Sequence, residues 1–146
     1  SYQMRVAVRD LTTSRIGSAS EFVSVPNLEN KQLALSGILM TQESSVSPNL
    51  DLTARRFTSG MNVRFSAQIF NASLDPATQR PQVAVQPFLY RDGKRVLTGP
   101  SLSVDAGNQK DLQRLAVSSV MRLTADLEPG NYYLQLVATD LLSKQK

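Results

Sequence analysis

One pattern of alternating apolar residues occurs twice in this chain, once near each end. The first copy consists of Tyr2, Met4, Val6 and Val8, and the second of Tyr132, Leu134, Leu136 and Ala138. The copies lie 130 positions apart, and each is closed by an aspartate, Asp10 or Asp140. Apolar residues at every second position share one face of a β-strand. The chain is therefore expected to contain the same half-buried strand twice.

The two copies differ in their C-terminal neighbours. A second strand-like segment comes after the first copy and ends at Val25, whereas the second copy runs to Lys146 without such a partner. A repeated strand indicates repeated domains. The predicted organisation is a terminal hairpin of a preceding β-sandwich at residues 1–25, a linker at 26–31, and a β-sandwich lacking its last strand at 32–146. In the alternative, the strands of residues 1–25 complete the fold of the second domain.

The second copy begins with a turn whose residues predict a defined structure. Pro129 and Gly130 fit the central positions of a turn in which the second residue has positive φ. Tyr132 comes next at the spacing of a tyrosine corner, in which the ring packs in the core and the hydroxyl group binds nearby backbone. We therefore expect structural roles for Pro129, Gly130 and Tyr132.

The residues between the two copies predict further strands and a long loop at 42–53. The strong alternation of residues 63–69 is typical of a central strand. A slip in the alternation of residues 32–40 at Gly37 predicts a β-bulge. Pro87 interrupts another alternating segment and has no N–H group, so it predicts an edge position or a bulge.

Asp92 and Gly93 favour a type I′ turn between two hairpin strands, because both central residues of that turn have positive φ. No segment shows sustained helical periodicity. Together these patterns predict an all-β chain: an immunoglobulin-like or fibronectin-like Greek-key β-sandwich of about seven or eight strands, preceded by a β-hairpin.

Composition narrows the chemistry of the chain. Its 146 residues include no cysteine and no histidine, which excludes disulfides, thiolate metal sites and the commonest general base. The 16 Lys and Arg residues against 12 Asp and Glu residues leave a net charge of +4, but they are scattered rather than clustered as in nucleic-acid binders. No apolar run approaches the roughly 20 residues that span a bilayer. We expect no nucleic-acid partner, no membrane insertion of this fragment and no cofactor.

Carboxylates are the remaining candidates for catalysis or metal binding. Asp92, Asp105, Asp111, Asp126 and Asp140 each fall at a predicted turn or strand end, where turn chemistry alone favours aspartate. No motif places two of them together, so we assign no catalytic residue and no metal ligand. The densest oxygen cluster, at residues 105–108 with Asp111, leaves a loop calcium site open, although it matches no calcium-loop spacing.

Three apolar residues lie on the strand faces opposite the predicted core. They are Phe70, Tyr133 and Val137, and we expect them at an interface with a neighbouring domain of the same parent protein. The predicted absence of a last strand also leaves an open sheet edge, which is a template for strand addition. A homodimer formed by strand exchange is therefore a second expected association.

Several strand and turn segments together carry a resemblance to a known group of proteins. They are Tyr2 to Asp10, Gly17 to Ser20, Val25 to Leu28, Leu33 to Gly37, Arg91 to Lys94, and Leu127 to Tyr132. In this combination the chain resembles the region C-terminal to the von Willebrand factor A domain in bacterial VWFA-related proteins. The resemblance implies an accessory β-sandwich of a large exported protein, and hence a periplasmic or secreted location. The Asp-x-Ser-x-Ser adhesion motif of the A domain is absent from this sequence, so the resemblance implies no metal site.

These observations favour a non-catalytic module that acts as a spacer or mediates protein–protein or interdomain contacts. The chain begins without Met, which favours an excised part of a larger protein. Two alternatives remain: a carbohydrate-binding module, which shares the architecture, and a carboxylate-dependent hydrolase. Sugar binding normally uses exposed aromatic residues, and the chain has no Trp and only 4 Tyr.

Overall fold

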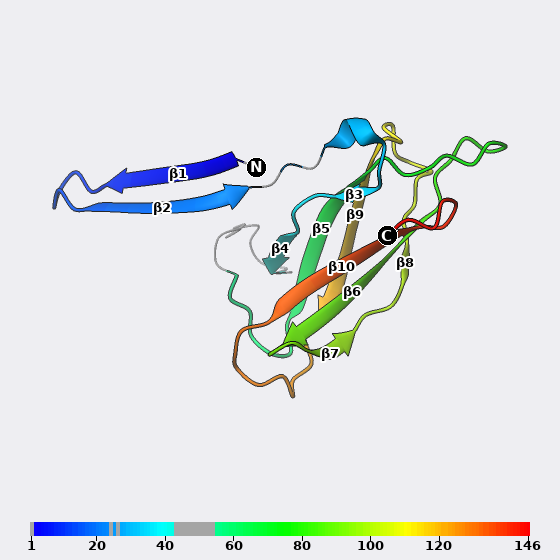
Figure 1. The fold of residues 1–146 in the computed structure, drawn as a ribbon. Coiled ribbons are helices and arrows are strands. Elements are labelled where there is room, and N and C mark those ends of the chain that lie inside the picture. Colours follow the sequence, from blue (N-terminus) through cyan, green and yellow to red (C-terminus); the bar gives the residue numbers. More distant parts are fainter. Residues whose placement is uncertain (1, 24, 26, 43–54) are drawn as a thin grey trace. The chain divides into compact units, whose positions relative to one another are not determined.

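The computed structural model of the chain describes residues 2–23, 25, 27–42 and 55–146 (Figure 1). Its regular elements are β-strands apart from one short 3-10 turn, η1 (Leu28–Asn30), so the all-β prediction is confirmed. The chain divides into two compact units, Ser1–Asn30 and Lys31–Lys146, which we call the first and second units. Apart from Gln42, the predicted loop at 42–53 lies outside the described residues.

The first unit contains an antiparallel hairpin of β1 (Tyr2–Arg9) and β2 (Ile16–Val23). Its register is unbroken from Tyr2 opposite Val23 to Arg9 opposite Ile16. Every residue of both strands is exposed. Because directly opposed residues share a face, one face is apolar and comprises Tyr2, Met4, Val6, Val8, Ala19 and Val23 together with Gly17 and Glu21.

The second unit is a β-sandwich of two four-stranded antiparallel sheets. In one sheet, β5 (Asn62–Phe70) pairs along its length with β9 (Arg114–Arg122), and its other edge carries β3 (Ala34–Leu35) and β4 (Leu39–Gln42). In the other sheet, β6 (Val83–Arg91) pairs with β10 (Tyr133–Asp140), and its other edge carries β7 (Lys94–Thr98) and β8 (Leu102–Ser103).

The core lies between the two central strands, β5 and β6. Alternate residues of each are buried, so each sheet turns one apolar face inward. Phe65, Ile69, Val83, Val85 and Leu115 are among the largest fully buried side chains. Residues 63–69 therefore form the predicted central strand, and period-two alternation was the signal that identified it.

The bulge predicted at Gly37 is present in the strand pairing. Leu35 is opposite Ile69 and Leu39 is opposite Ser66, so four residue steps on one side correspond to three on β5. Two hydrogen bonds between Ser36 and Gln68 stabilise the bulge. Gln68 N donates to Ser36 Oγ at 2.9 Å, and Ser36 N donates to Gln68 O at 2.8 Å. One extra residue thus separates β3 from β4.

The edge position predicted for Pro87 is wrong, because Pro87 is buried in the central strand β6 opposite Leu136. The register irregularity of this strand lies between Leu89 and Tyr90 instead. Successive residues of an antiparallel strand direct their backbone N–H and C=O groups to opposite sides, and this explains why a proline fits here. The backbone of Pro87 faces the gap between β7 and β8, where its carbonyl group accepts a hydrogen bond from Gly99 N at 2.8 Å. Its missing N–H group therefore costs no strand pairing.

The same type of turn occurs three times, beginning at Asp10, Asp75 and Asp140. In each, the Asp N–H group donates to the carbonyl group five residues later, at 2.9, 2.9 and 3.0 Å. The Asp Oδ1 atom accepts from the N–H groups two and three residues later. The residue four positions on has positive φ: Ser14, Gln79 and Lys144. The chain thus reverses after β10 with the same geometry that joins β1 to β2.

A substitution at Gly99 tests the contact with Pro87. A Cβ atom at Gly99 would lie 2.5 Å from Pro87 Cγ, closer than packed atoms tolerate. We expect Gly99→Ala to lower the free energy of unfolding by about 1–3 kcal/mol, measured by urea denaturation. Gly37→Ala is the matched control, because no atom lies within 4 Å of its added Cβ. An equal loss in both variants would contradict this account.

Asp140 predicts a pH dependence of stability. Burial raises the pKa of this carboxyl group, but hydrogen bonds from Ser73 N and Ser143 Oγ, both 2.8 Å, and from Leu142 N outweigh burial and lower the pKa to about 2. A lowered pKa stabilises the folded state above the unfolded pKa of 3.8, and this contribution is lost as the pH falls towards 2.

We therefore expect Asp140→Asn to destabilise the second unit by about 2 kcal/mol at pH 7. The difference from the unsubstituted chain should shrink below pH 4, as followed by denaturant titration at a series of pH values. Asp75→Asn, in the same type of turn but only partly buried, whereas Asp140 is fully buried, should cost much less. A pH-independent difference for Asp140→Asn would contradict the assignment.

Candidate binding groove beside the open edge of β10

A groove with a volume of about 1090 Å³ lies in the second unit between β10 and the segment that joins β3 to β4. We call it the β10 groove. It is lined by Leu35, Ser36, Gly37, Ile38, Met40, Arg55, Phe57, Thr58, Ser59, Val63, Leu89, Met121, Leu123 and residues 127–136. These residues come from both sheets, so among the described residues the groove opens between the two layers of the sandwich.

The floor of the β10 groove is apolar and its rim is polar. Val63, Leu89, Met121 and Leu136 line it and are buried core residues. Exposed polar residues at its boundary include Arg55, Ser59, Glu128 and Asn131. A concave apolar surface with a few polar groups at its rim is typical of binding sites.

The edge of β10 beside the groove offers backbone hydrogen-bonding groups. Leu141 N donates to Gln82 O at 2.8 Å on the side of β6, whereas Asp140 N donates to Gln145 O on the other side. Because bonding direction alternates along an antiparallel strand, the N–H and C=O groups of Leu134, Leu136 and Ala138 point away from β6.

Within the described part of the chain, β10 pairs with β6 alone. Apart from the bond within the Asp140 turn, the backbone N–H and C=O groups on the other edge of β10 therefore face no described strand. Leu136 and Ala138 are buried residues, and buried backbone groups are costly without hydrogen-bond partners. The edge and the groove together have the features of a strand acceptor.

At one end of the groove, the turn before β10 is held by a polar cluster. The Tyr132 hydroxyl group donates to the Glu128 carbonyl oxygen at 2.7 Å, which is the geometry of a tyrosine corner. Arg91 Nη1 lies 2.8 Å from Glu128 Oε2, and the guanidinium group lies 5.6 Å from the centroid of the Tyr132 ring. The hydrogen bond with Glu128, and then that with Tyr132, raise the pKa of Arg91.

The other residues expected at this turn lie in the same region. Pro129 and Gly130 line the groove, but the positive φ predicted for Gly130 is wrong, because the glycines with positive φ in the described part of the chain are Gly60 and Gly93. A Cβ atom at Gly130 would lie 3.3 Å from Arg91 Nε. Asp92 and Gly93 form the two-residue turn between β6 and β7, with φ values of 49° and 74°. Both values are positive, as a type I′ turn requires.

The three residues predicted at an interface are not brought together as one surface. Tyr133 is 70% exposed and lines the groove. Phe70 ends β5 in the other sheet and is partly buried, as is Val137 in the middle of β10. Only Tyr133 of the three therefore belongs to the groove.

The predicted carboxylates lie in separate turns. Asp105 Oδ1 accepts from Gly107 N at 2.7 Å, and Asp111 Oδ1 accepts from Gln113 N at 3.0 Å. Asp111 Oδ2 also lies 3.5 Å from Arg114 Nε. A hydrogen bond from the Thr124 side chain lowers the pKa of Asp126. Among the described residues, no group of three acidic residues has an arrangement that would hold a metal ion.

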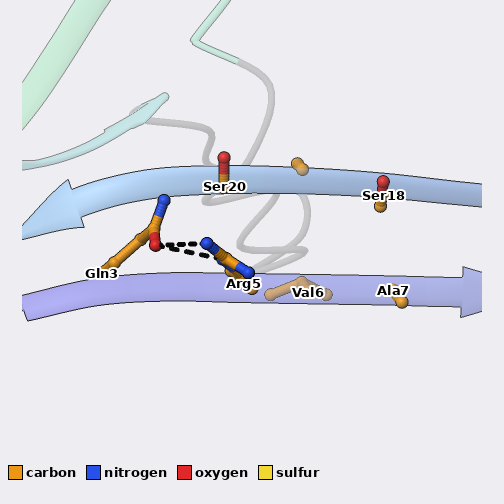
Figure 2. A pocket seen from close by; sticks show the side chains of 7 residues that line it. Gln3, Arg5, Val6, Ala7, Ser18 and Ser20 are labelled. Carbon is orange, nitrogen blue, oxygen red and sulfur yellow. Dashed lines mark hydrogen bonds between the residues drawn. The ribbon is translucent and has the colours of Figure 1, made fainter.

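A second, smaller hollow lies on the first unit and is shown in Figure 2. Its volume is about 440 Å³, and Gln3, Arg5, Ala7, Ser18 and Ser20 are among its lining residues. The Arg5 guanidinium group donates to Gln3 Oε1 at 2.7 and 3.1 Å. This hollow is an open strand surface, whereas the β10 groove reaches the core.

Comparison of the chain with protein-family models, curated proteins and solved structures finds no match. Across the described ranges, the chain forms no helix with the length and apolar character needed to cross a membrane.

A substitution at Tyr132 tests the polar cluster at the end of the groove. Tyr132→Phe removes the hydroxyl group that donates to Glu128 O, so we expect the free energy of unfolding to fall by about 1 kcal/mol. Tyr133→Phe, at an exposed neighbouring position, should change it by less than about 0.5 kcal/mol. Chemical denaturation measures both variants, and equal effects would contradict the role of Tyr132.

Proposed function

We propose that the chain is a non-catalytic β-sandwich module that mediates protein–protein or interdomain contacts. The observation that carries this proposal is the β10 groove beside an edge of β10 that faces no described strand. An apolar groove supplies side-chain pockets and a free strand edge supplies backbone hydrogen bonds, the two components of strand-addition recognition. The preferred partner class is therefore a polypeptide in extended conformation.

The setting of this contact is part of the same proposal. The resemblance to bacterial VWFA-related proteins supports an accessory module of a larger exported protein, with an immunoglobulin-like or fibronectin-like topology. Neighbouring domains of the parent protein are then the nearest partners, in a periplasmic or secreted location. The separate turns that hold the five predicted aspartates support a role without catalysis.

One observation favours a second candidate, a carbohydrate-binding module. Phe57, Tyr132 and Tyr133 all line the groove, and aromatic side chains provide flat apolar surfaces for ligands. Tyr133 is the most exposed of them and would be the main contact for a sugar ring. A carboxylate-dependent hydrolase has no comparable observation in its favour.

Site-specific cross-linking tests the proposed function. A photoactivatable phenylalanine analogue at Asn131, on the rim of the groove, should give cross-links to polypeptide when the chain is expressed and irradiated in a bacterial periplasm. The same analogue at Lys94, on the exposed strand β7, is the matched control. We expect polypeptide adducts at Asn131 that are absent at Lys94, detected by mass spectrometry.

Two results would contradict this function. Equal cross-linking at the two positions would show that the groove is not a contact site. Saturable binding of soluble oligosaccharides, abolished by Tyr133→Ala and measured by calorimetry, would favour the carbohydrate-binding module instead.

A further inference from the structure

We infer that the open edge of β10 accepts a strand with the sequence of β2, supplied by a second copy of this chain. The inference rests on the proposed function and names the partner of the same groove. It is drawn from the internal repeat, because the first unit shows which strand pairs with a strand like β10.

The backbone groups of β2 match those of the β10 edge. Asp10 N donates to Arg15 O at 2.9 Å, so Gly17, Ala19 and Glu21 direct their N–H and C=O groups towards β1. Asp140 and Gln145 repeat this bond at the end of β10. A strand that continues the same register places Gly17 opposite Ala138 and Ala19 opposite Leu136, antiparallel to β10.

The side chains of β2 suit the β10 groove. In this register Gly17, Ala19, Glu21 and Val23 share the face that turns towards the groove. The two smallest residues lie beside the buried Leu136 and Ala138, where little space is available. Glu21 lies further along the groove, which Arg55 lines with the opposite charge.

Release of β2 from its own hairpin requires little free energy. All residues of β1 and β2 are exposed, so their ladder has no buried face to stabilise it, and two-stranded hairpins are marginal in water. Transfer to β10 replaces that ladder with one of the same length and covers an apolar groove. Exchange of identical elements between copies is a low-cost route to dimers.

The first experiment measures the mass of the full chain by sedimentation velocity over about a hundredfold range of concentration. We expect a concentration-dependent dimer. Ala19→Pro removes the N–H group that faces β10 and should weaken dimerisation at least about tenfold. Ser20→Pro is the matched control, because the Ser20 N–H group points to the other edge of β2, and it should dimerise like the unsubstituted chain.

The second experiment adds a labelled peptide of residues 15–25 to the full chain. We expect binding by fluorescence anisotropy, competition with the dimer, and loss of binding for the Ala19→Pro peptide. A chain that stays monomeric but binds the peptide would overturn the second copy as the partner, while the groove remains a polypeptide site. A monomer that does not bind the peptide, including one whose own hairpin occupies the edge, would overturn the inference itself.

Cross-links from Asn131 to other polypeptides together with a monomeric chain would leave the proposed function intact and reject this partner. Equal dimerisation of the Ala19→Pro and Ser20→Pro variants would show that association does not use the β2 backbone. These outcomes therefore distinguish the case in which the second copy is the wrong partner from the case in which the groove is not a contact site.

Discussion

The antiparallel pairing of β10 with β6 is the interaction on which the second unit depends. It places Leu136 and Ala138 against the core and brings Asp140 to the end of the sheet, where Ser73 and the adjoining turn bind its carboxylate. The same pairing determines which backbone groups of β10 point outward. One ladder therefore builds the core, positions the groove and defines its free edge.

The edge and the groove belong together in physical terms. A sheet edge alone offers hydrogen bonds without specificity, and a groove alone offers apolar area without direction. Their combination at β10 selects an extended chain whose alternate residues fit between the two sheets. The polar cluster of Arg91, Glu128 and Tyr132 holds one end of this site, and the turn at Asp140 holds the other.

Much of the fold was accessible from the sequence because it is encoded locally. Period-two alternation predicted the central strand of residues 63–69, the slip at Gly37 predicted the bulge, and Asp92-Gly93 predicted a tight hairpin turn. The position of Pro87 was mispredicted, because its tolerance depends on a gap between β7 and β8 that no local pattern reveals. The groove was not predicted, since Leu35, Leu89 and Leu127 are distant in sequence and only the packed sheets bring them to one surface. The three Asp turns could have been recognised from the sequence, because each aspartate is followed four positions later by a polar residue that takes positive φ.

The central claim, that a strand covers the open edge of β10, can be tested by amide hydrogen exchange along β10. The N–H groups of Gln135 and Val137 face β6 and serve as an internal reference, whereas those of Leu136 and Ala138 face the open edge. In the associated chain we predict comparable protection for both sets of amides. Fast exchange at Leu136 and Ala138 beside protected Gln135 and Val137, at every protein concentration, would contradict the account.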